Sequence, residues 1–407
     1  MPSLTKRSHG DGGIDTRGEN VHRLRYRHDG RRFTTTFRGS LKEARIELGR
    51  LIQSGHSGEH IDPTKMTVEA WIDKWIALNQ RHAVETDGPR RRGLVNRRTL
   101  ERYEELLRCH VTPTLGKRPV QKLNGTEIDE LYVALEKKLS PRTVHHIHTV
   151  LGACLKAAVR KGHLKANPVA RAEAPSPGES DHGMALDEDQ LRTLLVGFRP
   201  SVLFPIVAVL AFTGARRGEV LALRWSDLDI EKKTLRIERA VEQTSEYGLA
   251  IKEPKTKRGK RTITIDDDLI DLLITEREKL QRMQAGVPDG APVDLSLVKL
   301  PDDALMFPCP PKQGDSFSFT NLRKPDNTTK EFLRRAKLLG FPELRMHDLR
   351  GTHETLLLDA GVPVHVVAAR CGHDPATLLR SYAKHSKKAD TSAAAVIGAL
   401  SKGVLKS

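Results

Sequence analysis

Five short segments in the second half of the chain carry basic, histidine and tyrosine side chains at suggestive spacings. They are 213–219 (TGARRGE), 254–261 (PKTKRGKR), 347–353 (HDLRGTH), 371–373 (CGH) and 381–385 (SYAKH). In the third segment, a spacing of three residues puts His347 and Arg350 side by side on one helix face, where both can donate hydrogen bonds to one anion. The pattern therefore indicates chemistry on an anionic group, although each segment alone is also typical of a solvated turn or of structural residues.

The histidines and cysteines do not predict a metal centre. His353-Glu354 begins the HExxH pattern of zinc peptidases, but that pattern needs a second histidine where the chain has Leu357. The four cysteines lie far apart and form no CxxC pair, so neither a disulfide framework nor a cysteine-built zinc site is predicted. They are Cys109, Cys154, Cys309 and Cys371.

The chain that carries these segments is long and strongly basic. Its 407 residues are more than one core usually fills, which predicts two or three domains. Lys and Arg number 68 against 52 Asp and Glu, and the formal charge of +16 favours nucleic acid or another polyanion as partner. A soluble enzyme that is basic for other reasons remains an alternative at this point.

The apolar residues exclude two classes of protein. They make up 38% of the chain, enough to build cores, so wholesale disorder is not expected. The longest near-continuous apolar run, 202–212, is shorter than the roughly 20 residues of a membrane span. No apolar stretch follows the basic N-terminus to make a secretion signal. We therefore expect a soluble protein of a reducing compartment, without membrane association.

Residues 1–60 are expected to form a small sheet covered by a helix. Segments 21–26 and 32–37 alternate like two strands joined by a turn at 28–31. Their apolar residues share one face, which a helix could cover, and arginines lie on the opposite face. Such a face can enter the major groove of DNA, although it is equally typical of a solvated surface. The arginines are Arg23 and Arg25 with Arg32 nearby, and the apolar residues are Leu24, Tyr26, Phe33 and Phe37.

Residues 66–172 are predicted to be all helical. Apolar residues recur at helical spacing after Thr67, a candidate N-cap, and helical patterns follow at 99–109 and 126–138. The clearest pattern starts at Ser140-Pro141 and stops at Gly162. Residues 173–184, rich in Pro, Gly and Ser without periodicity, are predicted to be a linker.

Residues 185–407 form a third predicted unit, of mixed type. Asp187 and Gln190 have the spacing of a capping box, and a buried helix is expected around 202–212. Alternation around 235–237 and 263–265 predicts strands of a small sheet, and helices are expected from 327 onward. The predicted fold class is therefore multidomain, mainly helical with small β-sheets.

In their order along the chain, the five segments resemble the active site of the tyrosine recombinases, the site-specific recombinases of the phage-integrase type. The resemblance covers about 185–390 and consists of TGxRxGE, a strand lysine, HxLRxTH, GH and a tyrosine nine residues after that histidine. HxLRxTH is its most specific part. Residues 99–123 are similar to the family's core-binding domain. Residues 1–60 are similar, more loosely, to the arm-binding domains of lambda-type integrases. The long basic stretch 81–98 departs from the family pattern.

The resemblance implies a role for each of six residues. Arg216 and Arg350 would clamp the scissile phosphate, His347 would add a third donor or take the nucleophile's proton, and His373 would hold the phosphate from the other side. Lys255 would protonate the leaving 5′ oxygen, and Tyr382 would form a covalent 3′-phosphotyrosine, with no ATP, metal or other cofactor needed. Arg217 is the alternative to Arg216, and Lys257 or Lys260 to Lys255. Glu219, Asp348 and His353 are expected to orient their neighbours.

The function implied is site-specific recombination of double-stranded DNA. The chain would act as the integrase of a phage or other mobile element in the bacterial cytoplasm, associated with the nucleoid. Two alternatives are a catalytically idle DNA-binding regulator or architectural protein on the same fold, and a DNA-relaxing topoisomerase. By analogy with relatives, a homotetramer on DNA and accessory DNA-bending or directionality factors are expected. The C-terminal tail would dock on a neighbouring protomer or on its own domain through Ala393, Val396, Ile397 and Leu400.

Overall fold

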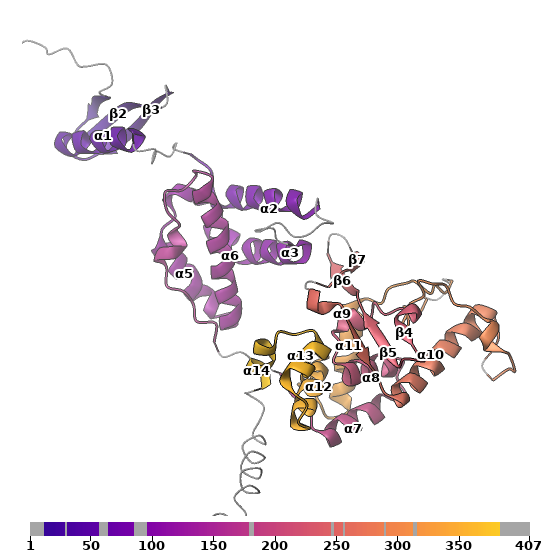
Figure 1. Cartoon of the computed structure of the whole chain (residues 1–407). Helices are drawn as coiled ribbons and strands as arrows, with labels where there is room; N and C mark the ends of the chain where they lie inside the picture. Colours follow the sequence, from indigo (N-terminus) through magenta and orange to yellow (C-terminus); the bar gives the residue numbers. More distant parts are fainter. Residues whose placement is uncertain are drawn as a thin grey trace, which may run out of the picture. The chain divides into compact units, whose positions relative to one another are not determined.

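The computed structural model divides the chain into two compact units, 1–180 and 181–407, whose elements are labelled in Figure 1. Helices predominate, and the described strands form three small antiparallel sheets. The predicted fold class, multidomain and mainly helical with small sheets, is confirmed. The structure describes residues 12–28, 31–56, 64–84, 96–178, 183–245, 248–254, 257–288, 290–311 and 316–382.

The N-terminal residues form a three-stranded antiparallel sheet with one helix on it. Leu24 and Tyr26 are buried against Ala44 and Leu48 of the helix, so the predicted apolar face is correct. The structure adds a first strand that was not predicted, because its sequence, GIDTRG, is rich in glycine and has little alternation. The elements are β1 (Gly13–Gly18), β2 (Val21–His28), β3 (Arg31–Arg38) and α1 (Leu41–His56).

The regular elements that the structure describes between residues 64 and 178 are all helices, as predicted. Helix α6 begins as expected, because the Ser140 side chain accepts from the Thr143 N–H and proline occupies the first turn. The indole Nε1 of Trp71 donates to the carbonyl of Cys154 across 3.0 Å and joins two of the helices. The α-helices are α2 (Val68–Val84), α3 (Arg97–Leu106), α4 (Thr112–Leu115), α5 (Gly125–Glu136) and α6 (Pro141–Arg160).

The expected linker, 173–184, is described only in part. Its first residues lie against the helical domain, where the backbone N–H of Glu173 donates to Asp129 and the carbonyl of Pro175 lies 2.8 Å from Nδ1 of His145. Residues 179–182 lie outside the described part of the chain, so the linker stays a prediction.

The C-terminal unit is built around α8 (Phe204–Thr213), a helix that is apolar except for Thr213. A helix that is apolar on all sides is stable only when it is enclosed, and α8 packs against α7, α9, α10 and α12. The capping box predicted at Asp187 and Gln190 begins α7. The helices are α7 (Glu188–Phe198), α9 (Arg217–Val220), α10 (Asp267–Ala285), α11 (Pro325–Leu338), α12 (Asp348–Asp359), α13 (Val364–Cys371) and α14 (Pro375–Tyr382).

A small sheet and a hairpin complete the C-terminal unit. Leu235 pairs with Ile263 in the antiparallel sheet β4–β5–β8, and both side chains enter the core that surrounds α8. The strands predicted around 235–237 and 263–265 are therefore confirmed. The strands are β4 (Leu228–Asp229), β5 (Thr234–Ile237) and β8 (Arg261–Thr264), with β6 (Ala240–Thr244) and β7 (Gly248–Lys252) as the hairpin. Among the described helices, none is both long and apolar enough to span a membrane.

Candidate active site

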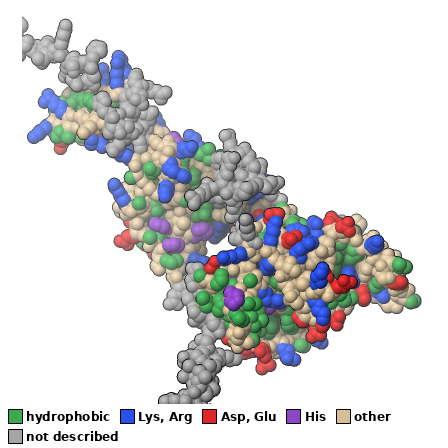
Figure 2. Space-filling model, in the orientation of Figure 1, with side chains coloured by type: hydrophobic (Ala, Val, Ile, Leu, Met, Phe, Trp, Pro, Cys, Tyr) green, Lys and Arg blue, Asp and Glu red, His purple; other side chains and the backbone are tan. Residues whose placement is uncertain are grey.

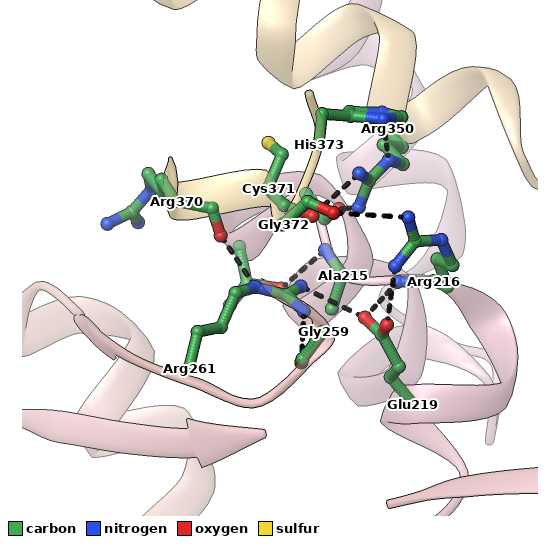
Figure 3. A network of polar contacts seen from close by, with 12 residues as sticks. Ala215, Arg216, Glu219, Gly259, Arg261, Arg350, Arg370, Cys371, Gly372 and His373 are labelled. Carbon is green, nitrogen blue, oxygen red and sulfur yellow. Dashed lines mark hydrogen bonds and ion pairs between the residues drawn. The ribbon is translucent and has the colours of Figure 1, made fainter. Parts of the chain in front are cut away.

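The C-terminal end of α13 brings two arginines to one place. The helix ends at Gly372, whose φ of 68° favours glycine, and an added Cβ would lie 2.8 Å from the carbonyl of Arg258. The carbonyl of Cys371 accepts from Nη2 of Arg350 at 2.6 Å, and the carbonyl of Gly372 accepts from Nη2 of Arg216 at 3.4 Å. Two successive carbonyls thus orient two guanidinium groups directly before His373 (Figure 3).

The ends of α8 and α13 fix the guanidinium of Arg350 on α12, and its side chain is only 2% exposed. Its Nη1 donates to the carbonyl of Gly214 at 2.6 Å, where α8 ends in the left-handed conformation. A Cβ on Gly214 would lie 2.7 Å from the ring of His353, so only glycine lets α8 and α12 approach this closely. Each terminal nitrogen uses one N–H on a carbonyl in these bonds and carries a second N–H that an anion could accept.

The neighbouring arginines Arg216 and Arg217 have different surroundings. The backbone N–H of Arg216 donates to Oε2 of Glu219 at 2.9 Å, and its Nη1 donates to Oε1 at 2.8 Å, while 41% of its side chain stays exposed. Arg217 instead donates to the carbonyl of Pro325 and the hydroxyl of Thr329 on α11. The contacts therefore direct Arg216, and not Arg217, toward Gly372.

The ring of His373 lies against Arg350 and beside a basic cavity. Its Nε2 is 3.0 Å from Nε of Arg350 and 2.9 Å from Oε1 of Glu354. The cavity, of about 400 Å³, is a space that an anionic group could enter. Its lining includes Arg258, Lys260, Arg261, His365 and His373.

His347 lies directly before α12. The protein around its ring and the positive charges of Arg350 and Arg216 lower the pKa of His347. The imidazole is therefore neutral at neutral pH and able to accept a proton. The adjacent Asp348 accepts from the backbone and side chain of Arg345, and its expected orienting role in the site stays a prediction.

Two of the six predicted site residues fall wholly or partly outside the described part of the chain. Lys255 is not described, and Tyr382 ends α14 with its side chain outside the description. The ammonium group of Lys260, one alternative to Lys255, donates to Glu253 at 2.8 Å, while the side chain of Lys257 is not described. The expected roles of Lys255 and Tyr382 stay predictions.

Arg261 is a central residue of the site that the sequence analysis did not single out. From the start of β8, its Nε donates to the carbonyl of Arg370, its Nη1 to that of Gly259, and its Nη2 to Glu219 at 2.9 Å (Figure 3). The alternation of the strand could have indicated this position, because Arg261 lies two residues before the buried Ile263 and therefore on the same face of β8.

His353 is a buried histidine that connects the helices around the site. Its Nδ1 donates to the carbonyl of Ala211 at 2.9 Å, and its Nε2 accepts from Nε of Arg370 at 3.1 Å. Burial and the charge of Arg370 lower the pKa of His353 to about 4, so the ring is neutral. His353 therefore joins α12 to α8 and α13.

Arginines cover the outer face of the N-terminal sheet. Arg25 is exposed and donates to Asp15 across 2.6 Å, and Arg32 is exposed on β3. Arg23, on the same face of β2, is half-buried. Figure 2 shows Lys and Arg side chains on the visible face of this part. Among the described residues, no cluster of three or more His, Cys, Asp or Glu side chains is arranged to hold a metal ion.

Comparison with known proteins gives consistent matches along the chain. Residues 185–389 match the model of the phage integrase family, and residues 69–174 match that of the phage integrase central domain. The chain is 28% identical over 369 residues to a protein named tyrosine recombinase XerC-like from Caldanaerobacter subterraneus subsp. tengcongensis, a match that covers 84% of this chain and 85% of that protein.

Two solved structures share the fold. One is the Tn1549 transposon integrase in complex with a circular intermediate DNA, with a TM-score of 0.59, 20% identity, and coverage of 82% of this chain and 99% of that one. The other is a lambda integrase tetramer bound to a Holliday junction, with a TM-score of 0.53, 16% identity, and coverage of 89% and 95%. The likeness extends over both compact units of the chain.

Proposed function

The chain belongs to the phage integrase family, and from this premise we propose the role of each site residue in DNA strand exchange. As a member of that family it is a site-specific tyrosine recombinase, an enzyme that breaks and rejoins DNA. The observation that carries the proposal is the convergence of Arg216 and Arg350 on the carbonyls of Cys371 and Gly372, beside His373.

Arg216, Arg350 and His373 bind the scissile phosphate. Charge gathers on the non-bridging oxygens as the phosphodiester becomes pentacoordinate, and guanidinium groups already held in place stabilise it without reorganising. The hydrogen bonds of Arg350 to the carbonyls of Gly214 and Cys371 support this role, because they hold its guanidinium group in place before DNA binds.

His347 accepts the proton of the nucleophile. Its lowered pKa supports this role, since a neutral imidazole at neutral pH is a base, whereas a protonated one is not. Arg350 and Arg216, whose charges lower that pKa, are the same groups that bind the phosphate.

Tyr382 is the nucleophile and Lys255 the general acid. The Tyr382 hydroxyl oxygen bonds to phosphorus as the bond between phosphorus and the 5′ oxygen of deoxyribose breaks. The tyrosine proton passes to His347, and the departing 5′ oxygen takes a proton from Lys255. In rejoining, a 5′ hydroxyl attacks the 3′-phosphotyrosine and releases Tyr382, so the phosphoester bond is conserved and no ATP is consumed.

The other parts of the chain hold double-stranded DNA. Residues 1–60 bind an arm-type site through the arginine face of β2 and β3, residues 66–172 bind the core site, and 173–184 link them to the catalytic domain, 185–407. The match of 69–174 to the integrase central domain supports the second assignment. Because the substrate is chromosomal and mobile-element DNA, we place the enzyme in the bacterial cytoplasm.

The working form on DNA is a homotetramer, assisted by DNA-bending or directionality factors. The lambda integrase tetramer on a Holliday junction supports this assignment through the shared fold. Mass photometry of the protein with two duplexes that carry its recombination site should detect four protomers. A complex that stays at two protomers throughout recombination would contradict the assignment.

Covalent trapping tests the proposed function. The full chain is incubated with sheared genomic DNA of its host, denatured and trimmed with nuclease, and mass spectrometry then searches for a nucleotide on the Tyr382 peptide. We expect an adduct in the wild type and in Tyr103→Phe, a matched change of another tyrosine, but not in Tyr382→Phe. DNA that is retained specifically without any adduct would favour a binding protein, and strand cleavage by Tyr382→Phe would overturn the nucleophile assignment.

A further inference from the structure

A buried carboxylate lies inside the proposed phosphate site. Glu354 follows Arg350 by four residues on α12, and its side chain is only 8% exposed. Its Oε1 lies 3.1 Å from Nε of Arg350 and 2.9 Å from Nε2 of His373. No role described above uses this side chain, although it contacts two of the three groups assigned to the phosphate.

Glu354 carries a negative charge in this position. Burial alone would raise the pKa of Glu354, but contact with His373 and the charge of Arg350 hold it below its ordinary value. The thiol of Cys371, whose pKa burial raises to about 12, also faces the carboxylate. The titratable groups around it are Arg350, His347 and His353 at α12, Cys371 at the end of α13, and His373.

The three contacts among Arg350, His373 and Glu354 cannot all be satisfied with one placement of protons. If Nε2 of His373 accepts from Arg350, it carries no proton and faces Oε1 of Glu354 with two electron pairs opposed at 2.9 Å. Oε1 is then a buried acceptor without a well-aligned donor among the described residues. If Nε2 carries a proton, His373 donates to Oε1, and Nε of Arg350 still lies within ion-pair distance of the same oxygen.

The protonated Nε2 is the arrangement that gives the buried Oε1 of Glu354 a hydrogen-bond donor. The partner of one imidazole nitrogen determines the tautomer and the direction of the ring. With Nε2 held by Glu354, the nitrogen that remains for a phosphate is Nδ1. Donation from Nδ1 requires the imidazolium form, for which the carboxylate of Glu354 is the counter-charge.

We propose that Glu354 is a positioning residue for DNA cleavage, which holds the proton of His373 on Nε2 and thereby directs Nδ1 to the scissile phosphate beside the fork of Arg350. Glu354 itself does not touch DNA. The inference rests on the proposed function of the site and adds to it the group that sets the orientation of His373.

Glu354→Gln separates this role from DNA binding, because glutamine keeps the shape and removes the charge. A nicked duplex built from the trapped recombination site is mixed with saturating protein, and the single-turnover rate of covalent attachment is measured beside affinity from mobility shifts. We expect the rate to fall about 10- to 100-fold, while affinity stays equal or rises, since a negative charge is lost near the phosphate. Glu278→Gln, which removes an exposed carboxylate on α10, should leave the rate unchanged.

A double-mutant cycle with His373→Ala distinguishes positioning from general support of the fold. If Glu354 acts through His373, adding Glu354→Gln to His373→Ala should slow cleavage much less than it slows the wild type. Fully additive losses would overturn the proposal. So would equal cleavage by Glu354→Gln and wild type, whereas a wild type without any adduct would instead refute the proposed function.

The proton can also be observed without changing Glu354. In full-length protein with ¹⁵N-labelled histidine, the His373 signals are assigned by their loss in His373→Ala. We expect the ¹⁵N shifts and the one-bond couplings to place a proton on Nε2. A ring protonated only at Nδ1 would overturn the proposal even if Glu354→Gln failed to fold.

Discussion

Arg261 donates through Nη2 to Oε2 of Glu219 across 2.9 Å, and the two side chains are only 6% and 3% exposed. Burial alone would raise the pKa of Glu219, yet the charges of Arg261 and Arg216 hold it below its ordinary value. The same carboxylate orients Arg216, while Arg261 also reaches the carbonyl of Arg370 at the end of α13. One buried ion pair therefore connects β8, α9 and α13 around the phosphate site.

Loss of Arg261 should strongly destabilise the catalytic domain. Arg261→Met leaves the buried Glu219 with Arg216 as its remaining partner, and breaking a buried pair typically costs about 3–5 kcal/mol. Urea unfolding of the full chain, followed through the catalytic-domain transition, measures the loss.

The control is Arg334→Met on α11, where the pair with Glu331 is exposed. Surface pairs contribute about 1 kcal/mol or less, so this change should be nearly silent. Equal losses in the two variants would show that burial does not set the strength of the Arg261 pair.

The helices and the motif order could be predicted from the sequence, because their signals are local. Capping residues, apolar periodicity and the spacing of HxLRxTH each depend on a few neighbouring positions, and α6, α7 and α8 formed as expected. The glycine-rich β1 was missed, since its pairing with β2 supplies the order that its own residues do not indicate.

The supporting residues could not be predicted, because their partners are distant in the sequence. Arg261 contacts Glu219 and Arg370, and Glu354 meets His373 only after α12 and α13 have packed. The two-residue spacing of Arg261 from Ile263 indicates the face of the strand on which Arg261 lies. The four-residue spacing of Glu354 from Arg350 indicates its face of the helix. Neither spacing predicts which side chains pack against that face.

Arg216 and Arg217 should respond differently to the same substitution. Arg216→Lys loses the fork that reaches both Glu219 and Gly372, so we expect covalent attachment to DNA to slow by about 100-fold or more with little change in affinity. Arg217→Lys loses its contacts with α11 and should lower thermal stability while folded protein still cleaves. Single-turnover attachment at saturating protein measures both, and the reverse order of effects would reassign the phosphate clamp to Arg217.

The buried His353 should make stability fall between pH 6.5 and pH 4. Its pKa is about 4 in the folded protein, against an ordinary value of 6.5 in the unfolded chain. Between these values the unfolded state binds more protons, so the stabilisation is complete above pH 6.5 and is lost as the pH falls toward 4. The free energy of unfolding should drop by about 3 kcal/mol from this group.

His353→Gln isolates that contribution, because glutamine can donate to Ala211 and accept from Arg370 without titrating. Its free energy of unfolding should fall less than that of the wild type between pH 7 and pH 4. His365→Gln, an exposed change on α13, should keep the wild-type slope. If His353→Gln also kept that slope, the acid sensitivity would belong to other groups, such as Glu219 and Glu354.

Arginines on the outer face of the N-terminal sheet should set part of the salt dependence of DNA binding. Each phosphate neutralised by a basic side chain contributes about 0.9 to the slope of log affinity against log salt concentration. Replacing Arg23, Arg25 and Arg32 together by glutamine should therefore reduce the slope by about 2–3 on duplexes that carry an arm-type site. A matched triple change on α1, Lys42, Arg45 and Arg50 to glutamine, removes the same charge from exposed positions off this face. If the salt-dependence slope falls by the same amount in both triple variants, the sheet face has no special role, and the domain attracts DNA only through its net charge.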